Sequence, residues 1–367
     1  MHDLIDYLLL VSTLVVRLVV TAVTLAASPA LFLVSRALSS RHTPPAPPRS
    51  AVDPATGPAI LITGASAGIG AALAVEYARR SAAADGAVAL HLLGRNADRL
   101  AAVAATASAA ATAARAAAAA AAAGTGAGGG KLPPAAPALR VHTAVCDVGA
   151  GPEPVDAAVD AAEAAEAAAG NTAGLTTLII NAGVAVSTLP PGSRGMGGAQ
   201  PILRVNLLGA VATAAAGVRV MLPRRRGHLV FVGSATADFV GVPAGFASYG
   251  ASKAGLRYYA AAAAAGLSAD GITVTGVDPW FVGTAMTTAP ALARWNWDVA
   301  VAAAGMADGI ARDAASGGGL WTWPRGVALL GGGVWAALPV QAQLLIGRAL
   351  VAARAPGLRL RFAKVSG

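Results

Sequence analysis

Short apolar runs alternate with Ala-rich stretches of helical length from Ala59 onwards. The runs Ala59–Ile62, Val88–Leu93, Leu178–Ile180 and Gly227–Val232 have the length and composition of buried strands. Strands buried on both faces and separated by helices are typical of a parallel sheet covered by helices on both sides. The pattern therefore predicts a doubly wound α/β domain.

Residues 1–39 carry a different pattern. The segment Leu8–Val34 is apolar apart from Arg17 and a few small residues, and about 20 apolar residues are enough to cross a bilayer. A central arginine costs about 2.5–3.5 kcal/mol on insertion scales, which the rest of the segment offsets. Acidic residues near the start differ from the basic start of a cleaved signal peptide, and arginines follow the segment. We expect an uncleaved anchor with the following chain in the cytosol. A buried hydrophobic helix is the alternative.

The remaining regions differ in composition. Residues 40–58 are rich in proline and predict a linker. Residues 59–319 form the expected domain, with a low-complexity insert at 101–139 in which alanines extend a helix before a Gly- and Pro-rich loop. Residues 320–367 are apolar at first but interrupted by glycines and Pro339. We expect a hydrophobic tail that either lies on the membrane or dips into it.

The formal net charge is +9, but the arginines are scattered along the chain. A nucleic-acid-binding protein concentrates them on one element with interleaved aromatic residues, so we expect no nucleic-acid partner. The cluster Arg224–Arg226 is explained by a solvated turn. The single cysteine, Cys146, excludes an intramolecular disulfide and a cysteine-based metal site, and we expect no metal.

A glycine-rich turn joins the first strand to the next helix. Gly64, Gly68 and Gly70 stand in the sequence TGASAGIG (63–70). Glycines permit a tight turn and let the backbone approach a pyrophosphate, while the helix N-terminus offers N–H groups and the positive end of its dipole. Because the glycines lie between a strand and a helix, the segment predicts a Rossmann-type dinucleotide site.

The second strand ends at Arg95, and no acidic residue stands there. An acidic residue would bind the ribose 2′-OH of NAD, whereas arginine suits the 2′-phosphate of NADP. We expect NADPH as the cofactor, with Arg95 and Ser66 as phosphate contacts; the alternative is that Arg95 is a plain surface residue. Asp147 and Asn181 follow two later strands, where strand ends line the ligand crevice of an open parallel sheet.

Tyr249 and Lys253 lie four residues apart at the start of a helical stretch, and therefore on one helix face. A phenol with a pKa near 10 is a poor acid at neutral pH, and we expect the neighbouring ammonium group to lower that pKa. Tyr249 then becomes a proton donor, and the compact ammonium of Lys253 can also reach a cofactor ribose. A chance Tyr/Lys pair is the alternative.

Two polar residues upstream are further candidates. Ser234 follows an apolar strand and can donate a hydrogen bond to a carbonyl oxygen as negative charge builds on it, with Thr236 as a competitor. Asn206 stands within a helical run, where asparagine is unfavourable, so a functional or hydrogen-bonding role is indicated.

Together these segments resemble the short-chain dehydrogenase/reductase family. The matching segments, in the family's order, are TGASAGIG (63–70), CDV (146–148), NAG (181–183), N-x-x-G (206–209), Ser234 and YGASK (249–253). The resemblance implies a catalytic tetrad in which Asn206 supports a water-linked proton relay to Lys253. The tetrad residues are Asn206, Ser234, Tyr249 and Lys253. Further cofactor contacts implied by the resemblance are Ile69, Asn181, Tyr249, Lys253, Pro279 and Thr284.

A narrower resemblance is also present. Ser234 and Tyr249 are fifteen positions apart, two more than most members of the family use, and the run P-x-x-V-x-T-x-M spans 279–286. These features and the apolar tail resemble the very-long-chain 3-oxoacyl-CoA reductases and their 17β-hydroxysteroid dehydrogenase relatives, although the insert at 101–139 is foreign to them.

This resemblance implies NADPH-dependent reduction of long-chain 3-oxoacyl-CoA in fatty-acid elongation, at the endoplasmic reticulum membrane with the catalytic domain facing the cytosol. Elongase-complex proteins or a second copy of the chain are the implied partners. One alternative is another lipophilic ketone, such as a steroid, a retinoid or 3-ketosphinganine. A catalytically silent membrane scaffold is the other alternative, and its expected signature is loss of Tyr249 or Lys253, both of which are present.

Overall fold

Seven parallel strands form one sheet in the part of the chain that the computed structural model describes, which comprises residues 57–81, 88–124, 139–185, 199–238, 247–287 and 296–323. The order across the sheet is β3-β2-β1-β4-β5-β6-β7. The strands are β1 (Ala59–Thr63), β2 (Ala89–Gly94), β3 (Arg140–Val145), β4 (Thr177–Ile180), β5 (Gly227–Val232), β6 (Ile272–Pro279) and β7 (Gly319–Trp323). The predicted α/β fold is confirmed.

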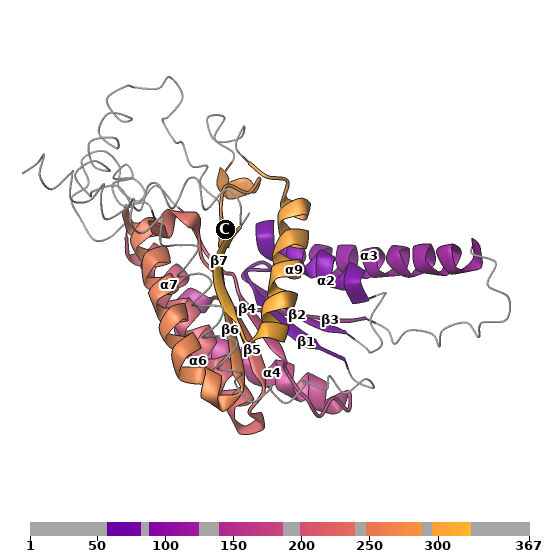
Figure 1. Ribbon diagram of the computed structural model, residues 1–367, viewed down its shortest axis with the longest axis horizontal. Helices are drawn as coiled ribbons and strands as arrows, with labels where there is room; N and C mark the ends of the chain where they lie inside the picture. Colours follow the sequence, from indigo (N-terminus) through magenta and orange to yellow (C-terminus); the bar gives the residue numbers. More distant parts are fainter. Residues whose placement is uncertain are drawn as a thin grey trace, which may run out of the picture.

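Helices cover both faces of this sheet (Figure 1). Those on one face are α2 (Gly68–Arg80), α3 (Ala97–Gly124) and α9 (Val299–Ser316). Those on the other are α4 (Pro152–Ala168), α6 (Ala210–Met221) and α7 (Ala247–Leu267). Shorter segments are η2 (Val148–Ala150), α5 (Gln200–Leu203), η4 (Arg204–Gly209), η5 (Leu222–Arg224), η6 (Ala235–Asp238), η8 (Ser268–Asp270) and η9 (Ala285–Thr287).

Each strand contributes to two hydrophobic cores, because successive side chains point to opposite faces. In β1, Ile60 and Ile62 pack in the core beneath α2, α3 and α9. Ala59 and Leu61 pack in the core beneath α4, α6 and α7. All five residues of β1 are buried, which explains why this segment is a continuous apolar run instead of an alternating one.

The connection order reverses beside β1. The chain runs outward from β1 through β2 to β3 and then returns to β4, which pairs with the other edge of β1. Ligands of open parallel sheets bind at such a switch point, outside the carboxyl ends of the strands. The carboxyl ends of β1 and β4 therefore define where a dinucleotide lies.

The helix α3 is 28 residues long, and Figure 1 shows its C-terminal part reaching beyond the sheet. Its extension to Gly124 confirms that the alanine-rich start of the 101–139 insert continues a helix, as alanine is the strongest helix former. Two described segments, Ala97–Ala121 and Gln200–Arg224, are long and apolar enough to cross a membrane. Both belong to helical layers of the domain, so this property alone is weak evidence for a membrane.

The last strand corrects a predicted boundary. Residues 320–323, assigned from their composition to a membrane-associated tail, belong to β7, whose residues pair in parallel register with Thr275–Pro279 of β6. Short apolar segments at a sheet edge and at the start of a membrane segment have the same composition, and the pairing with β6 distinguishes them. The anchor (1–39), most of the linker (40–58) and the rest of the tail lie outside the described residues.

A buried polar cluster joins α4 to the sheet. Glu166 is fully buried, and its carboxylate binds His91 Nε2 at 2.8 Å, Arg140 Nη2 at 2.5 Å and Asn171 Nδ2 at 2.7 Å. Burial alone raises the pKa of Glu166, but the bonds to His91 and Asn171 and the charge of Arg140 hold this pKa below its usual value. These contacts satisfy a carboxylate that would otherwise be costly to bury.

The same cluster contains three groups of metal-ligating type, His91, His142 and Glu166, within 4.8 Å of one another. The two imidazole rings are stacked, with centroids 4.8 Å apart and an interplanar angle of 11°. Two nearly parallel rings at this separation cannot both hold one ion in their planes, and Arg140 already occupies the carboxylate. We therefore interpret the cluster as a structural network.

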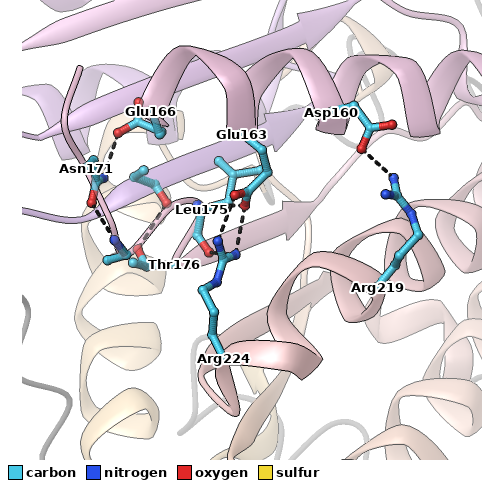
Figure 2. Close-up of polar contacts among 10 residues, drawn as sticks. Asp160, Glu163, Glu166, Asn171, Leu175, Thr176, Arg219 and Arg224 are labelled. Atoms are coloured by element: carbon cyan, nitrogen blue, oxygen red, sulfur yellow. Dashed lines mark hydrogen bonds and ion pairs between the residues drawn. The ribbon is translucent and has the colours of Figure 1, made fainter. Parts of the chain in front are cut away.

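Ion pairs also join α4 to α6 and to the turn after it (Figure 2). Arg219 binds Asp160 at 2.8 Å, and Arg224 forms a two-pronged contact with Glu163 at 2.7 and 2.8 Å. Arg224 is only 27% exposed in its side chain. The interpretation of Arg224–Arg226 as a solvated turn is therefore wrong for Arg224, because its planar guanidinium matches the carboxylate of a neighbouring helix.

Candidate active site

The predicted cofactor loop joins β1 to α2 at the switch point. Gly64 and Gly68 have φ values of +66° and +58°, which L-residues with side chains rarely adopt. A Cβ on Gly64 would approach Ala182 Cα to 2.8 Å, and one on Gly70 would approach the Gly64 carbonyl oxygen to 2.5 Å. All three glycines are therefore required for the loop to turn and for α2 to start against it.

Thr63 and Asn181 fix this loop to the end of β4. Thr63 Oγ1 accepts hydrogen bonds from the backbone N–H groups of Asn181 and Ala182, at 3.0 and 3.1 Å. The Asn181 side chain donates to the Thr63 carbonyl oxygen at 3.0 Å. Asn181 thus lies at the carboxyl end of the central strands, as predicted, where it connects the end of β4 to the end of β1.

The end of β2 lies beside the same loop. Ser66 packs against Gly94, since a Cβ on that glycine would lie 3.2 Å from Ser66 Oγ. Arg95 follows Gly94 and is exposed. The predicted pair, Ser66 and Arg95, is therefore brought to one edge and is open to a ligand, and the glycine cradle fits a dinucleotide phosphate. Asp147 is exposed at the end of β3 and accepts a hydrogen bond from Gly149 N at 2.9 Å, which caps η2.

The other expected cofactor residues lie at different depths. A Cβ on Gly68 would lie 3.3 Å from Thr284 Cγ2, so Thr284 packs against the glycine loop. Pro279 is buried at the carboxyl end of β6. Ile69, in the first turn of α2, packs against the core beneath that helix. Thr284 is thus beside the loop, whereas Ile69 contributes packing.

Tyr249 and Lys253 project from the first turns of α7. Lys253 is 4% exposed, and its ammonium donates to the Val232 carbonyl oxygen at 2.9 Å. The ammonium lies 5.9 Å from the centre of the half-buried Tyr249 ring. The helix therefore places both groups at the carboxyl end of β5, on one face as their spacing predicts.

The pKa values differ from the expectation. Burial raises the pKa of Tyr249 above its usual value, the Ser234 hydroxyl opposes this as a hydrogen-bonding partner, and the charge of Asp278 adds to it. Burial lowers the pKa of Lys253 to about 8, with Asp278 opposing. The expected lowering of the Tyr249 pKa is therefore wrong for this structure, because burial of the phenol outweighs the groups that favour its ionisation.

Ser234 stands two residues after the end of β5, and a neighbouring residue orients its side chain. Thr236 donates to Ser234 Oγ twice, from Oγ1 at 2.9 Å and from its backbone N–H at 3.2 Å. A hydroxyl has two acceptor lone pairs and one hydrogen, so these bonds leave the Ser234 hydrogen available for donation. Thr236, considered as a competitor, instead supports Ser234.

Asn206 lies in a π-helical turn, η4, between α5 and α6. Such turns occur often at functional sites, and the turn here aims the fully buried amide at the chain after β4. Asn206 Oδ1 accepts from Val184 N at 2.8 Å, and Nδ2 donates to the Val184 carbonyl oxygen at 2.9 Å. Its Oδ1 and Lys253 Nζ would each lie 3.5 Å from a Cβ on Gly183, so both groups face the same glycine.

Three site residues were not anticipated. Ser252 is fully buried and joins Asn206 Nδ2, at 3.1 Å, to the Tyr249 carbonyl oxygen, at 2.7 Å. Asp278 and Arg257 form an ion pair, with Nε and Oδ2 2.6 Å apart, next to Ser234. Asp278 carries a sequence signal, because it is the charged residue in the otherwise uncharged run ITVTGVDP.

This arrangement suits carbonyl reduction. A bound nicotinamide dinucleotide supplies hydride. Tyr249 holds a proton at its phenol oxygen, and Ser234 offers a hydrogen-bond donor for the carbonyl oxygen on which charge develops. Lys253 places a buried positive charge beside Tyr249.

Comparisons with known proteins agree with this geometry. A family model described as short chain dehydrogenase matches residues 135–294. An uncharacterized oxidoreductase of Myxococcus xanthus (strain DK1622) is 33% identical over 230 residues, which cover 62% of this chain and 73% of that protein.

Solved structures share the fold. A putative short-chain alcohol dehydrogenase from Sinorhizobium meliloti 1021 is 26% identical with a TM-score of 0.54, covering 72% of this chain and 94% of its own. A short-chain dehydrogenase from Sphingobium yanoikuyae in complex with NADPH is 23% identical with a TM-score of 0.54, covering 84% and 98%.

The family match spans the residues from Asn206 to Lys253 that the sheet and α7 bring together. The Myxococcus relative extends the similarity to most of its own length. The chain therefore belongs to the short-chain dehydrogenase/reductase family and is an oxidoreductase.

Proposed function

We propose that the protein reduces the 3-oxo group of a long-chain acyl-CoA to the 3-hydroxy group with NADPH. The observation that carries the choice of substrate is the combination of the fifteen-residue spacing from Ser234 to Tyr249 with the run P-x-x-V-x-T-x-M at 279–286. The 3-oxoacyl-CoA, NADPH and one proton give 3-hydroxyacyl-CoA and NADP⁺. In this reaction Tyr249 delivers the proton to the carbonyl oxygen, and the proton is replaced from solvent.

The proposed cofactor is NADPH because of the charge at the end of β2. Arg95 is exposed there beside Ser66, and the segment Gly94–Asn96 contains no carboxylate. A 2′-phosphate would gain a charge-assisted hydrogen bond from Arg95, whereas the 2′-OH of NAD would lack its usual acidic partner.

The proposed location is the endoplasmic reticulum membrane, with the domain in the cytosol. The apolar segment Leu8–Val34 supports an anchor, and the arginines after it support the orientation. An anchor suits a substrate whose acyl chain partitions into lipid. Elongase-complex proteins or a second copy of the chain are the proposed partners.

The test is NADPH oxidation by the detergent-solubilised full chain with long 3-oxoacyl-CoAs, ketosteroids and 3-ketosphinganine. Among the compounds of this panel, the long 3-oxoacyl-CoAs are expected to be reduced with the highest kcat/KM. Turnover of another ketone without any acyl-CoA activity would transfer the proposal to that ketone. A cofactor-binding protein with no turnover on the whole panel would favour the membrane scaffold.

A further inference from the structure

A buried carboxylate lies directly behind the catalytic residues. Asp278, in the penultimate position of β6, is 7% exposed. Its Oδ1 accepts a hydrogen bond from Ser234 N at 2.8 Å, across two adjacent strand ends. A Cβ on Gly233 would overlap Asp278 Oδ1, so a glycine at this position is what lets the carboxylate reach the Ser234 backbone.

Arg257 holds this carboxylate in place. It lies one helical turn after Lys253 on α7, and its Nε donates to Asp278 Oδ2 at 2.6 Å. Its guanidinium also binds Asp238, at the end of η6, through two further hydrogen bonds. Arg257 therefore fixes both sides of the short segment that carries Ser234, from β6 on one side and from η6 on the other.

Charged and titratable groups on α7 and η6 surround Asp278. Lys253, Arg257 and Tyr249 face it from α7, and Asp238 lies beyond Arg257 on η6. Burial raises the pKa of Asp278, while Arg257, the Ser234 N–H and Lys253 oppose that rise. The carboxylate in turn raises the pKa of both Lys253 and Tyr249, because a nearby negative charge disfavours loss of a proton.

We propose that Asp278 is a positioning residue of the reduction site, which fixes Ser234 through its backbone N–H and places one negative charge beside the two proton-bearing groups, Tyr249 and Lys253. This role rests on the carbonyl reduction proposed above but not on the identity of the ketone. Arg257 acts through Asp278 and holds it at the Ser234 backbone.

The test compares the pH dependence of kcat/KM for reduction in the full-length wild type and in Asp278→Asn. Removing the negative charge favours loss of a proton from Tyr249 and Lys253, so the alkaline limb is expected to move to lower pH by about one unit. Asp313→Asn is the matched control. Asp313 is a buried carboxylate on α9, and it accepts a hydrogen bond at 3.2 Å from Thr275, which lies on β6 as Asp278 does. Replacing Asp313 should leave the alkaline limb at its wild-type pH. An Asp278→Asn limb that coincides with the wild-type limb would overturn the proposal.

A second measurement separates this proposal from the proposed function. Ultraviolet phenolate absorbance, taken as the difference between each protein and its Tyr249→Phe derivative, reports the ionisation of Tyr249 without any turnover. Ionisation at lower pH in Asp278→Asn is expected even if every ketone tested is inactive, and an unchanged titration would contradict the role of Asp278.

If Asp278→Asn does not fold, Arg257→Gln serves instead. It should lower kcat more than tenfold with the KM for NADPH nearly unchanged, and an unchanged kcat per folded molecule would refute the role.

Discussion

At the residue scale, the reduction site depends on keeping protons on a half-buried phenol, Tyr249, and a buried ammonium, Lys253. Burial favours the neutral form of both Tyr249 and Lys253, so it strengthens the hold of the phenol on its proton and weakens that of the ammonium. Asp278 is the nearby charge that favours protonation of both. The hydrogen bonds from Thr236 complete the arrangement by orienting Ser234.

The pKa of Lys253 predicts the pH range of reduction. This pKa is lowered to about 8, so the ammonium form predominates below pH 8, is half lost at this value and disappears above it. We expect kcat/KM for carbonyl reduction, measured by NADPH oxidation, to be level well below pH 8 and to fall as the pH rises through about 8. A rate that rises through this range would contradict the need for the ammonium.

Stability provides the control for that experiment. The folded pKa of Lys253 lies below its ordinary value of 10.5, so the unfolded chain binds more protons between about pH 8 and 10.5. The contribution of Lys253 to stability therefore increases with pH over the window in which the rate falls. Thermal unfolding across this window should show that loss of rate is separate from loss of structure.

Arg95 should determine the choice of cofactor. Arg95→Asp replaces the positive charge at the end of β2 with a carboxylate that can bind the ribose 2′-OH, so kcat/KM should decrease for NADPH and increase for NADH. A tenfold change in the ratio corresponds to about 1.4 kcal/mol. Arg312→Asp, an exposed position on α9, makes the same change in net charge and should leave the ratio unchanged. An unaltered preference in Arg95→Asp would show that the 2′-phosphate is bound elsewhere.

The sequence predicts the site residues whose spacing is local. Tyr249 and Lys253 are one turn apart on a helix, and the glycines of 63–70 precede one, so their placement follows from the pattern alone. Asp278 and Arg257 could not be assigned, because their contact with each other and with Ser234 depends on β5, β6 and α7 meeting in space. The burial of the Tyr249 phenol is likewise a tertiary property, which is why the expected lowering of its pKa was wrong.

At the scale of single elements, the helix that starts beside the glycine loop is the most constrained. The start of α2 lies against the Gly64 carbonyl oxygen and the Asn181 side chain, and each contact leaves no space for a Cβ on Gly70. The sequence predicts this strand, turn and helix closely. It does not predict the π-helical turn at Asn206, since no simple periodicity distinguishes such a turn from an α-helix.

Gly70→Ala should therefore weaken cofactor binding more than tenfold, because the Gly64 backbone oxygen, 2.5 Å from the added Cβ, must move. NADPH fluorescence titration measures this loss. Gly266→Ala is the matched control. Gly266 lies near the end of α7 with nothing within 4 Å of an added Cβ, so the change should keep the affinity and stabilise the fold by about 0.5–1 kcal/mol. Equal NADPH affinities of the two variants would show that the loop tolerates the displacement.

At the scale of the whole molecule, the sheet and its two helical layers account for most of the described residues between 59 and 323. The sequence predicts the class of this fold because alternation of strands and helices is visible along the chain. It misses β7, since an edge strand of five residues next to an apolar segment has no periodicity of its own.

The proposed anchor predicts how the full chain partitions. The protein should remain with membranes after an alkaline carbonate wash, whereas a variant lacking residues 1–39 should be released to a large extent, because about 20 apolar residues supply most of the insertion energy. Immunoblots of pellet and supernatant measure this. Quantitative release of the full chain by carbonate would contradict an anchor.

The central claim is that Tyr249 protonates a carbonyl that accepts hydride from NADPH. The most direct measurement uses NADPH deuterated at the transferred position, with the alcohol product analysed by mass spectrometry. The wild type and Tyr258→Phe, which alters an 80% exposed tyrosine on the same helix, should place one deuterium on the carbinol carbon at similar rates. Tyr249→Phe should bind NADPH but form this product about 10²–10⁴-fold more slowly. Product without deuterium from the wild type, or an undiminished rate from Tyr249→Phe, would contradict the account.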